Sequence, residues 1–274
     1  AVGERSEMSA ESKSRVDIGI PAAQLALAEA VAATGKPVVV LLRNGRGMEL
    51  SGAIRDAQAI LVTWFLGSET GHAVADVLFG DHAPVGRLPV SFPYASGQSP
   101  FYYAHKSTGR PSRPTDREFT SKFREVPHAA LYPFGHGLSY SPVSYSPVRL
   151  SSPTVTRDGS VTASVTLTNG GRHDASEVVQ LYIRDRVASI TQPVRLLKAF
   201  RRVTVPAGGS VEVSIPLPAS DLSFLGGDQR PTLEAGLDPV VGQADGAAHD
   251  HARGLGARLG EAGAPQPQVD AAAL

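Results

Sequence analysis

The sequence predicts an α/β sandwich, a mostly parallel sheet with flanking helices, followed by an all-β sandwich. In the first half, short apolar runs alternate with helical patterns, which is typical of parallel strands covered by helices. From residue 148 onward, short alternating segments are separated by turn residues, which is typical of an immunoglobulin-like sandwich. A chain of 274 residues is long enough for both domains.

The first helix is expected to begin at Pro21 and to end at Gly35. Proline is tolerated in the first turn of a helix, and glycine is a common stop signal. The apolar residues expected on its core-facing stripe are Leu25, Leu27, Ala28, Val31 and Ala32.

Two apolar runs predict buried strands. Residues 38–42 read VVVLL, which suits a parallel strand covered on both faces, and a turn follows at Asn44-Gly45. A short helix ending near residue 60 leads into a second such strand at residues 60–64. Together with the first helix, these runs predict successive units of one parallel sheet.

The stretch 64–93 reads WFLGSETGHAVADVLFGDHAPVGRLPVSFP, and the spacing of its apolar residues changes twice. Ala73, Val74, Val77 and Leu78 share one helical face within residues 71–79, and Gly80 is the stop signal. Residues 81–86 contain the turn residues Pro84 and Gly86. Residues 88–92 are expected to be a short extended segment with prolines at positions 89 and 93.

The second half predicts short antiparallel strands at residues 161–167, 178–183, 203–205 and 211–215, within a sandwich of about seven strands. A last strand near residues 234–242 contains Pro239, so it must be an edge strand or be disrupted. Residues 243–274 are rich in Ala and Gly and poor in large apolar residues, so this tail is expected to be disordered or altered by a frameshift.

Composition excludes several classes of function. The formal net charge of +0 argues against a nucleic-acid partner, and no apolar run is long enough to suggest a membrane partner. Cysteine is absent, so disulfide and thiolate chemistry are excluded, but the compartment stays open.

Motifs for common catalytic chemistries are also absent. There is no GxSxG nucleophile turn and no HExxH metal spacing, and Gly45-Arg46-Gly47 does not continue as a dinucleotide-binding motif. No metal and no cofactor is therefore expected. The remaining acid/base candidates, which composition does not rank, are Glu4, Glu11, Asp56, Glu69 and Asp76.

The polar loop 3–17 directly follows a strand-like end. In open α/β sheets, ligands meet the protein beyond the carboxyl ends of the strands, so this loop is a candidate site. The alternative is a solvated loop of mixed charge with no ligand.

A set of long motifs carries a family resemblance. The stretch 64–93 is followed by GQSP at residues 97–100, TGRP at residues 108–111 and LYPFGHGLSY at residues 131–140. In this order they resemble the C-terminal half of glycoside hydrolase family 3 enzymes of the bacterial periplasmic β-glucosidase type, over residues 1–242.

The resemblance implies the domain organisation. Residues 1–147 would be the family's C-terminal α/β sandwich domain, truncated at its N-terminus, and residues 148–242 its fibronectin type III-like domain. The family's N-terminal TIM barrel, which carries the nucleophilic aspartate, has no counterpart in this sequence. The implied partners are that barrel, in cis or in trans, and a β-linked oligosaccharide or aryl glucoside.

The resemblance also ranks the carboxylates. Gly3-Glu4 and the segment 8–15, MSAESKSR, match the family's acid/base loop, with Ala10 and Lys13 as departures. By this match Glu11 is the general acid/base, and Glu4 is the runner-up. Trp64, Glu69 and Asp81 stay open as sugar ligands against a purely conformational role.

The implied function is that of a C-terminal fragment of a retaining β-glycosidase that hydrolyses terminal β-D-glucosyl or related residues, in the periplasm or outside the cell. The chain alone is expected to be inactive, since a proton donor without its nucleophile gives little turnover. The alternatives are a non-catalytic accessory module that pairs with a separately encoded barrel, or the inactive product of a truncated gene.

Overall fold

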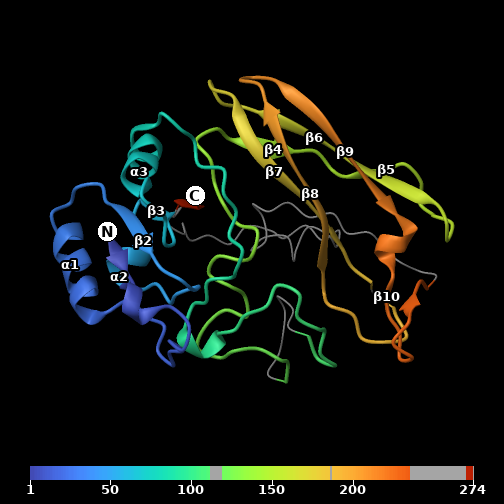
Figure 1. Cartoon of the computed structure of the whole chain (residues 1–274), viewed down its shortest axis with the longest axis horizontal. Helices are drawn as coiled ribbons and strands as arrows, with labels where there is room; N and C mark the ends of the chain where they lie inside the picture. Colours follow the sequence, from blue (N-terminus) through green and yellow to red (C-terminus); the bar gives the residue numbers. More distant parts are fainter. Residues whose placement is uncertain (112–118, 186, 235–269, 274) are drawn as a thin grey trace. The chain divides into compact units, whose positions relative to one another are not determined.

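The computed structural model describes residues 1–111, 119–185, 187–234 and 270–273 (Figure 1). They form two compact units. The first contains Ala1–Tyr102, Phe123–Ser139 and the described part of His251–Leu274, and the second contains the described parts of Tyr103–Lys122 and Tyr140–Asp250. The first unit is the expected α/β sandwich, the second is the expected β-sandwich, and neither contains a (β/α)8 barrel within the described residues.

The elements of the first unit are β1 (Val2–Gly3), η1 (Ser6–Met8), α1 (Ala22–Ala32), β2 (Val39–Arg43), α2 (Gly52–Arg55), β3 (Ala59–Val62), α3 (Thr70–Phe79), η2 (Ser96–Gln98) and β12 (Asp270–Ala273). Those of the second unit are β4 (Val143–Tyr145), β5 (Arg149–Leu150), β6 (Ser160–Asn169), β7 (Ala175–Ile183), β8 (Leu196–Val205), β9 (Ser210–Pro218), η3 (Ala219–Leu222), β10 (Phe224–Leu225) and β11 (Pro231–Thr232).

The sheet of the first unit is parallel throughout its described strands, in the order β1-β2-β3-β12. β1 pairs with β2 through Val2 opposite Leu42, and β2 pairs with β3 through Val40 opposite Ile60. The carboxyl ends of these strands therefore lie at one edge of the sheet, which is where the loops after β1 and β2 meet.

The strand β12 lies within the tail that was expected to be disordered or altered by a frameshift. Residues 270–273 pair in parallel with β3. The edge of β3 that β2 leaves open offers backbone donors and acceptors that another strand can satisfy. The rest of the range 243–274 lies outside the described residues, as do residues 235–242 of the expected last sandwich strand.

Burial on the two inner strands differs. In β3, Ile60 and Leu61 point to opposite faces and are both buried, so this strand is covered on both sides as expected. In β2, Val40 and Leu42 are buried, but Val39 is 50% exposed. The expectation of full cover on both faces was therefore wrong for β2, because one face of the strand has an incomplete layer over it.

The first helix has the expected bounds but not the whole expected stripe. Leu25 and Ala28 pack on the core of the first unit, whereas Leu27 is 57% exposed and Val31 is 42% exposed. Leu27 is two positions from Leu25, which is about 200° around the helix axis, so the two side chains cannot share a face.

The third helix ends as predicted. Gly80 follows α3 with φ of 87°, in the left-handed region, and its amide donates to the Val77 carbonyl at 3.2 Å. Val77 is buried, while Leu78 and Phe79 are exposed. The core face of α3 is therefore narrower than the sequence pattern suggested.

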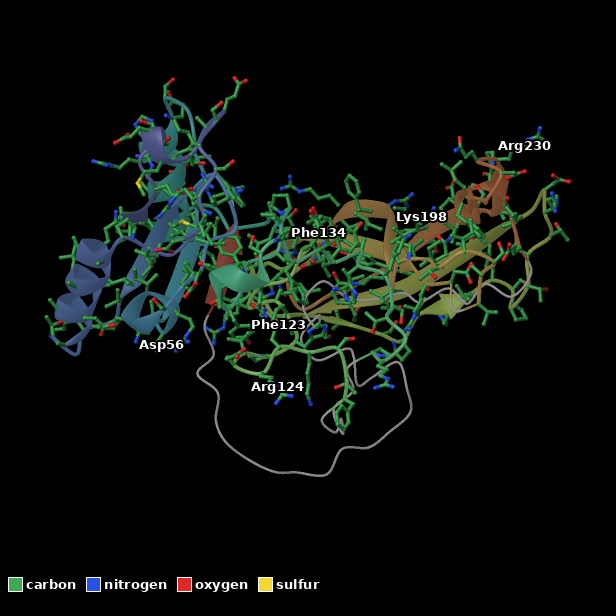
Figure 2. All side chains as sticks on the ribbon, turned by 90° about the horizontal axis from the view of Figure 1, so that it is seen from below. Asp56, Phe123, Arg124, Phe134, Lys198 and Arg230 are labelled. Atoms are coloured by element: carbon green, nitrogen blue, oxygen red, sulfur yellow. The ribbon has the colours of Figure 1, made fainter. Side chains whose placement is uncertain are left out.

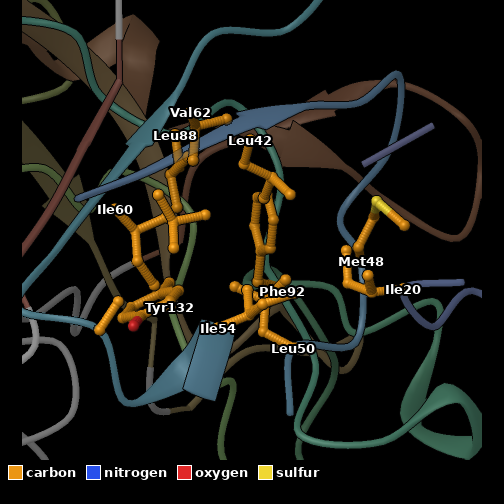
Figure 3. Packing of buried hydrophobic residues seen from close by; sticks show 12 residues of the cluster. Ile20, Leu42, Met48, Leu50, Ile54, Ile60, Val62, Leu88, Phe92 and Tyr132 are labelled. Carbon is orange, nitrogen blue, oxygen red and sulfur yellow. The ribbon is translucent and has the colours of Figure 1, made fainter. Parts of the chain in front are cut away.

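The core of the first unit joins strand residues to the segment 88–92 (Figure 3). Phe92 is fully buried, with its ring 6.2 Å from that of Trp64 and 6.3 Å from that of Tyr132. The amide of Phe92 donates to the Tyr132 carbonyl at 2.7 Å, and the amide of Leu88 donates to the His136 carbonyl at 2.8 Å. The expected extended segment is thus held at both of its ends by residues 132–136.

The sandwich of the second unit has long antiparallel pairs, β6 with β9 and β7 with β8. Along β6, Val161, Val165 and Leu167 alternate with more exposed residues and enter the core, as the sequence pattern predicted. The described strands run from β4 to β11, and three of them have two residues each. The longer segment of this unit starts at Tyr140 and includes β4, which is hydrogen-bonded to β6.

No helix in the described ranges is long and apolar enough to cross a membrane.

Candidate active-site loop

The candidate site is the loop that leaves the carboxyl end of β1. Gly3 has φ of 126°, and a Cβ there would lie 1.9 Å from the Arg43 carbonyl oxygen, so only glycine fits. The side chain of Gln24 holds the strand end: its Oε1 accepts from the Gly3 amide at 2.6 Å, and its Nε2 donates to the Gly3 carbonyl at 3.0 Å. The start of the loop is therefore anchored to the sheet and to α1.

Glu4 is the first carboxylate of the loop, and its side chain is fully buried. Arg15 Nη1 donates to Glu4 Oε1 at 3.1 Å, and Arg46 Nε is paired with the same oxygen at 2.9 Å. The amide of Gly45 donates to Oε2 at 3.2 Å. A carboxylate taken out of water needs such partners, and removing one member of a buried pair typically costs about 3–5 kcal/mol.

The second carboxylate, Glu11, lies at the tip of the loop and is exposed. The amide of Lys13 donates to the Ala10 carbonyl at 3.2 Å, which closes a four-residue turn around Glu11. Ser12, the third residue of this turn, has φ of 61°, a left-handed conformation that a non-glycine residue adopts at some cost. Within the described residues, the Glu11 carboxylate has neither a hydrogen bond nor an ion pair, so it is available to a ligand.

The two carboxylates of the loop therefore differ in what they can do. A group that protonates a substrate must come within hydrogen-bond reach of it. Glu4 is enclosed by this chain's own atoms, and any further domain could only bury it more. Glu4 therefore holds the loop to Arg46 and Gly45, whereas Glu11 has the exposure that proton transfer requires.

The other acid/base candidates belong to other segments of the first unit. Asp56, labelled in Figure 2, follows α2 and precedes β3, so it lies at the amino ends of the parallel strands, the edge opposite the loop. Glu69 follows the carboxyl end of β3, is exposed and contacts His72 at 2.7 Å. Asp76 is exposed on α3. Among the described residues, no hydrogen bond or ion pair joins these three carboxylates to the loop.

The residues left open as sugar ligands also separate. Trp64 has φ of 51° and packs partly buried on the core, which supports a conformational role. Asp81 is exposed in the turn after α3. A groove of about 450 Å³ lies beside α1 and α2, lined in part by Glu29, Lys36 and Asp56. It opens at the amino ends of the strands, so it is remote from Glu11.

Among the side chains that the structure describes, no group of three or more His, Asp or Glu residues is arranged to hold a metal ion.

Arg46 lies beside Glu4 but is not among the residues that the sequence predicted for the site. Gly45-Arg46-Gly47 stood out there only as an incomplete dinucleotide-binding motif. An arginine in a tight turn after one parallel strand, near two acidic residues after the neighbouring strand, was the available signal, because such loops meet at one edge of the sheet.

Comparison with known proteins supports the two-domain reading. The model of the glycosyl hydrolase family 3 C-terminal domain matches residues 1–140, and that of the fibronectin type III-like domain matches residues 177–237. A periplasmic beta-glucosidase of Salmonella typhimurium is 46% identical over 236 residues, which are 86% of this chain and 31% of that protein. A beta-xylosidase of Formosa agariphila is 35% identical over 249 residues, which are 91% of this chain and 34% of that protein.

A solved structure agrees in fold. The beta-glucosidase of Listeria innocua, solved in complex with isofagomine, superposes with a TM-score of 0.78 at 37% identity, over 85% of this chain and 32% of that one. The chain thus spans about a third of the length of each of these relatives. With a family model that matches more than half of its residues and relatives of this similarity, the chain belongs to glycoside hydrolase family 3.

Proposed function

We propose that this chain supplies the C-terminal domains, and the general acid/base, of a retaining β-glycosidase of the β-glucosidase type. The proposed substrates are β-linked oligosaccharides or aryl glucosides with a terminal β-D-glucosyl or related residue. The proposed partner is a family 3 barrel, in cis or in trans, and the proposed location is the periplasm or outside the cell. Two relatives with this segment are named as beta-glucosidases, and one of them as periplasmic.

The observation that carries the proposal is the state of the two carboxylates after β1. Retaining hydrolysis uses one carboxylate as nucleophile and a second to protonate the leaving oxygen and then to activate water. Glu11 is exposed at the tip of an anchored loop, and Glu4 is buried among arginines. We therefore assign proton transfer to Glu11 and the nucleophile to the barrel.

The proposed chemistry proceeds in two steps. The barrel's carboxylate attacks the anomeric carbon while Glu11 donates its proton to the glycosidic oxygen, which leaves as an alcohol. Glu11, now a carboxylate, takes a proton from water as that water attacks the glycosyl-enzyme, and the sugar is released.

The test joins this chain to the N-terminal part of the Salmonella relative, in place of that protein's own matching segment. Glu11→Gln should lower turnover of p-nitrophenyl β-glucoside by about 10²–10⁴-fold, because general acid–base catalysis contributes that much. The loss should be smaller for dinitrophenyl β-glucoside, whose leaving group needs less protonation. Added azide should restore turnover and yield the β-glucosyl azide, since azide needs no general base.

The matched control is Glu7→Gln. Glu7 lies in the same loop and forms a surface pair with Arg5 at 2.8 Å, so its removal should leave turnover unchanged. Full activity of the Glu11→Gln protein would contradict the assignment. Hydrolysis by the 274-residue chain without a barrel would contradict the division of the two carboxylates between domains. A folded hybrid with the wild-type loop and no turnover would favour an accessory module.

A further inference from the structure

The turn after β2 lies against the loop that carries Glu11. Residues 44–47 form this turn, and both Gly45 and Arg46 contact the loop. We infer that the turn positions the acid/base loop, with Arg46 as the positioning residue. The catalytic meaning of this inference rests on the function proposed for Glu11, whereas its structural part does not.

Arg46 closes the loop through two backbone carbonyls. Its Nη2 donates to the carbonyl oxygens of Met8 and Lys13, both at 2.9 Å. These carbonyls lie three residues before Glu11 and two residues after it, so one guanidinium ties together the two arms of the tip. A lysine ammonium has no planar fork with which to hold both carbonyls and Glu4 at the same time.

The Arg46 guanidinium is itself held in place. Its Nε pairs with Glu4 Oε1 at 2.9 Å, and its side chain is only 23% exposed. Asn44, which is fully buried, donates from Nδ2 to the Arg46 carbonyl at 2.7 Å. Both the backbone and the head group of Arg46 are thus held by contacts other than those to Met8 and Lys13.

Gly45 provides the surface on which the loop rests. A Cβ at this position would lie 2.0 Å from Ser9 Oγ and 3.0 Å from both Ser9 Cβ and Phe65 Cε2. The loop therefore packs directly against the turn at this glycine. A methyl group at residue 45 should lift the Ser9 side of the loop without removing a single charge.

Glu11 depends on these contacts because its own side chain has no partner in the part of the chain that the structure describes. Its position is set by the backbone of the turn Ala10–Lys13, and that turn is held by Arg46 and by the Ser9 contact. A catalytic group misplaced by about 1 Å can cost about 10²-fold in rate, so loosening the loop should slow proton transfer.

The structural arm of the test measures amide hydrogen exchange in the full 274-residue chain. Gly45→Ala should raise exchange of residues 8–15 about tenfold, since the loop loses its close packing. Adding Ser9→Gly should bring exchange part of the way back to the wild-type rate, because it removes the closer of the two side chains that the new Cβ meets and leaves Phe65 in place. The matched control is Gly97→Ala, where a new Cβ has no atom within 4 Å and exchange of residues 8–15 should stay unchanged.

A second pair of variants tests the guanidinium. Arg46→Met should raise exchange of residues 8–15, and Arg46→Lys should give an intermediate rate because the charge beside Glu4 is kept. Arg55→Met is the matched control, since Arg55 contacts the exposed Asp56 instead of the loop. If Arg46→Met does not fold, the Gly45→Ala and Ser9→Gly pair decides, because it leaves every buried charge in place. Unchanged exchange in folded Gly45→Ala and Arg46→Met chains would overturn the inference.

The catalytic arm uses the hybrid enzyme described above. Gly45→Ala and Arg46→Lys should lower kcat for p-nitrophenyl β-glucoside by about 10–100-fold, with a smaller loss for dinitrophenyl β-glucoside and little change in KM. Ser9→Gly should restore part of the kcat lost in Gly45→Ala. A purely structural role would lower the rate for both leaving groups equally, and that result would overturn the positioning role.

The two arms separate failure of this inference from failure of the proposed function. Suppose that Glu11→Gln slows turnover of p-nitrophenyl β-glucoside more than that of dinitrophenyl β-glucoside, and the turn variants do not. The acid/base role of Glu11 is then supported and the positioning role of the turn is contradicted. If Glu11→Gln has no effect while exchange rises in the turn variants, the turn holds the loop but the proposed function falls.

Discussion

His136 is a buried histidine of the first unit that takes no part in the proposed chemistry. Its ring stacks on that of Tyr132 with centroids 5.4 Å apart, and its Nε2 is buried with no hydrogen-bond partner among the residues that the structure describes. Burial, and to a smaller extent the nearby charge of Arg87, lower the pKa of His136 from 6.5 to about 4. Below pH 6.5 the unfolded chain binds a proton here that the folded chain excludes.

The first unit should therefore lose stability as the pH falls from about 6.5 to about 4, by on the order of 3 kcal/mol from this residue. Above that window the contribution is fully present. His136→Phe keeps a ring against Tyr132 and cannot titrate, so its urea midpoint should fall less over the same window. His72→Phe, at an exposed site, should behave like the wild type. Equal acid sensitivity of His136→Phe and the wild type would contradict the burial argument.

Tyr132 has the complementary property. Burial raises the pKa of its hydroxyl to about 12, mainly by desolvation, and the same environment disfavours the charged histidine. The LYPFGHGLSY motif thus contributes neutral, packed rings to the first core.

At the scale of elements, α3 shows how two glycines in one helix can have opposite effects. Gly80 lies after the last turn with φ of 87°, where a side chain is strained even though no atom is within 4 Å of the added Cβ. Gly71 lies inside the first turn, again with open space around it. The backbone conformation alone separates the two positions.

Gly80→Ala should destabilise the first unit by about 1–2 kcal/mol, because a left-handed conformation costs an L-residue that much. Gly71→Ala should be neutral or stabilise by up to about 1 kcal/mol, because alanine loses less backbone freedom than glycine in a helix. Urea denaturation of both variants, followed by helix circular dichroism, measures the pair. A stabilised Gly80→Ala protein would show that the cap is not left-handed in solution.

At the scale of the whole molecule, each unit has its own hydrophobic core. Leu42 is fully buried in the core of the first unit, and Leu217 is 1% exposed in the core of the second. The clusters that contain them share no residue among those described. Each unit therefore has the means to fold around its own buried surface.

Leu42→Ala and Leu217→Ala should each cost about 2–5 kcal/mol, as expected for a buried leucine replaced by alanine. The first should raise hydrogen exchange in β2 and β3, and the second in β6 and β9, with the other unit little changed. Exchange measured by peptide mass spectrometry separates the two. Equal loss of protection in both units from either variant would show one cooperative fold instead of two.

The sequence by itself predicted the elements whose signals are local. The spacing of apolar residues and the positions of proline and glycine predicted the helix after Pro21, the strands around Val40 and Ile60, and the helix end at Gly80. The structure confirms these elements. It also identified the family through motifs that the comparisons confirm. These features depend on neighbours along the chain, which a sequence displays directly.

Burial at individual positions could not be predicted as well from the sequence. Leu27 and Val39 are as apolar as their buried neighbours, and only the layers around them leave them exposed. The pairing of residues 270–273 with β3 was not predicted from the sequence either, because β3 lies about two hundred positions earlier in the chain.

The different environments of the two carboxylates after β1 were decided by the tertiary structure. Glu4 and Glu11 are the same residue type, and the sequence could rank them as acid/base candidates only through a family motif. The parallel pairing of β1 with β2 brings Arg46 beside Glu4, and that contact buries one carboxylate and holds the loop that exposes the other. Desolvation and charge pairing depend on which segments meet in space, so the fold determines them and the local sequence does not.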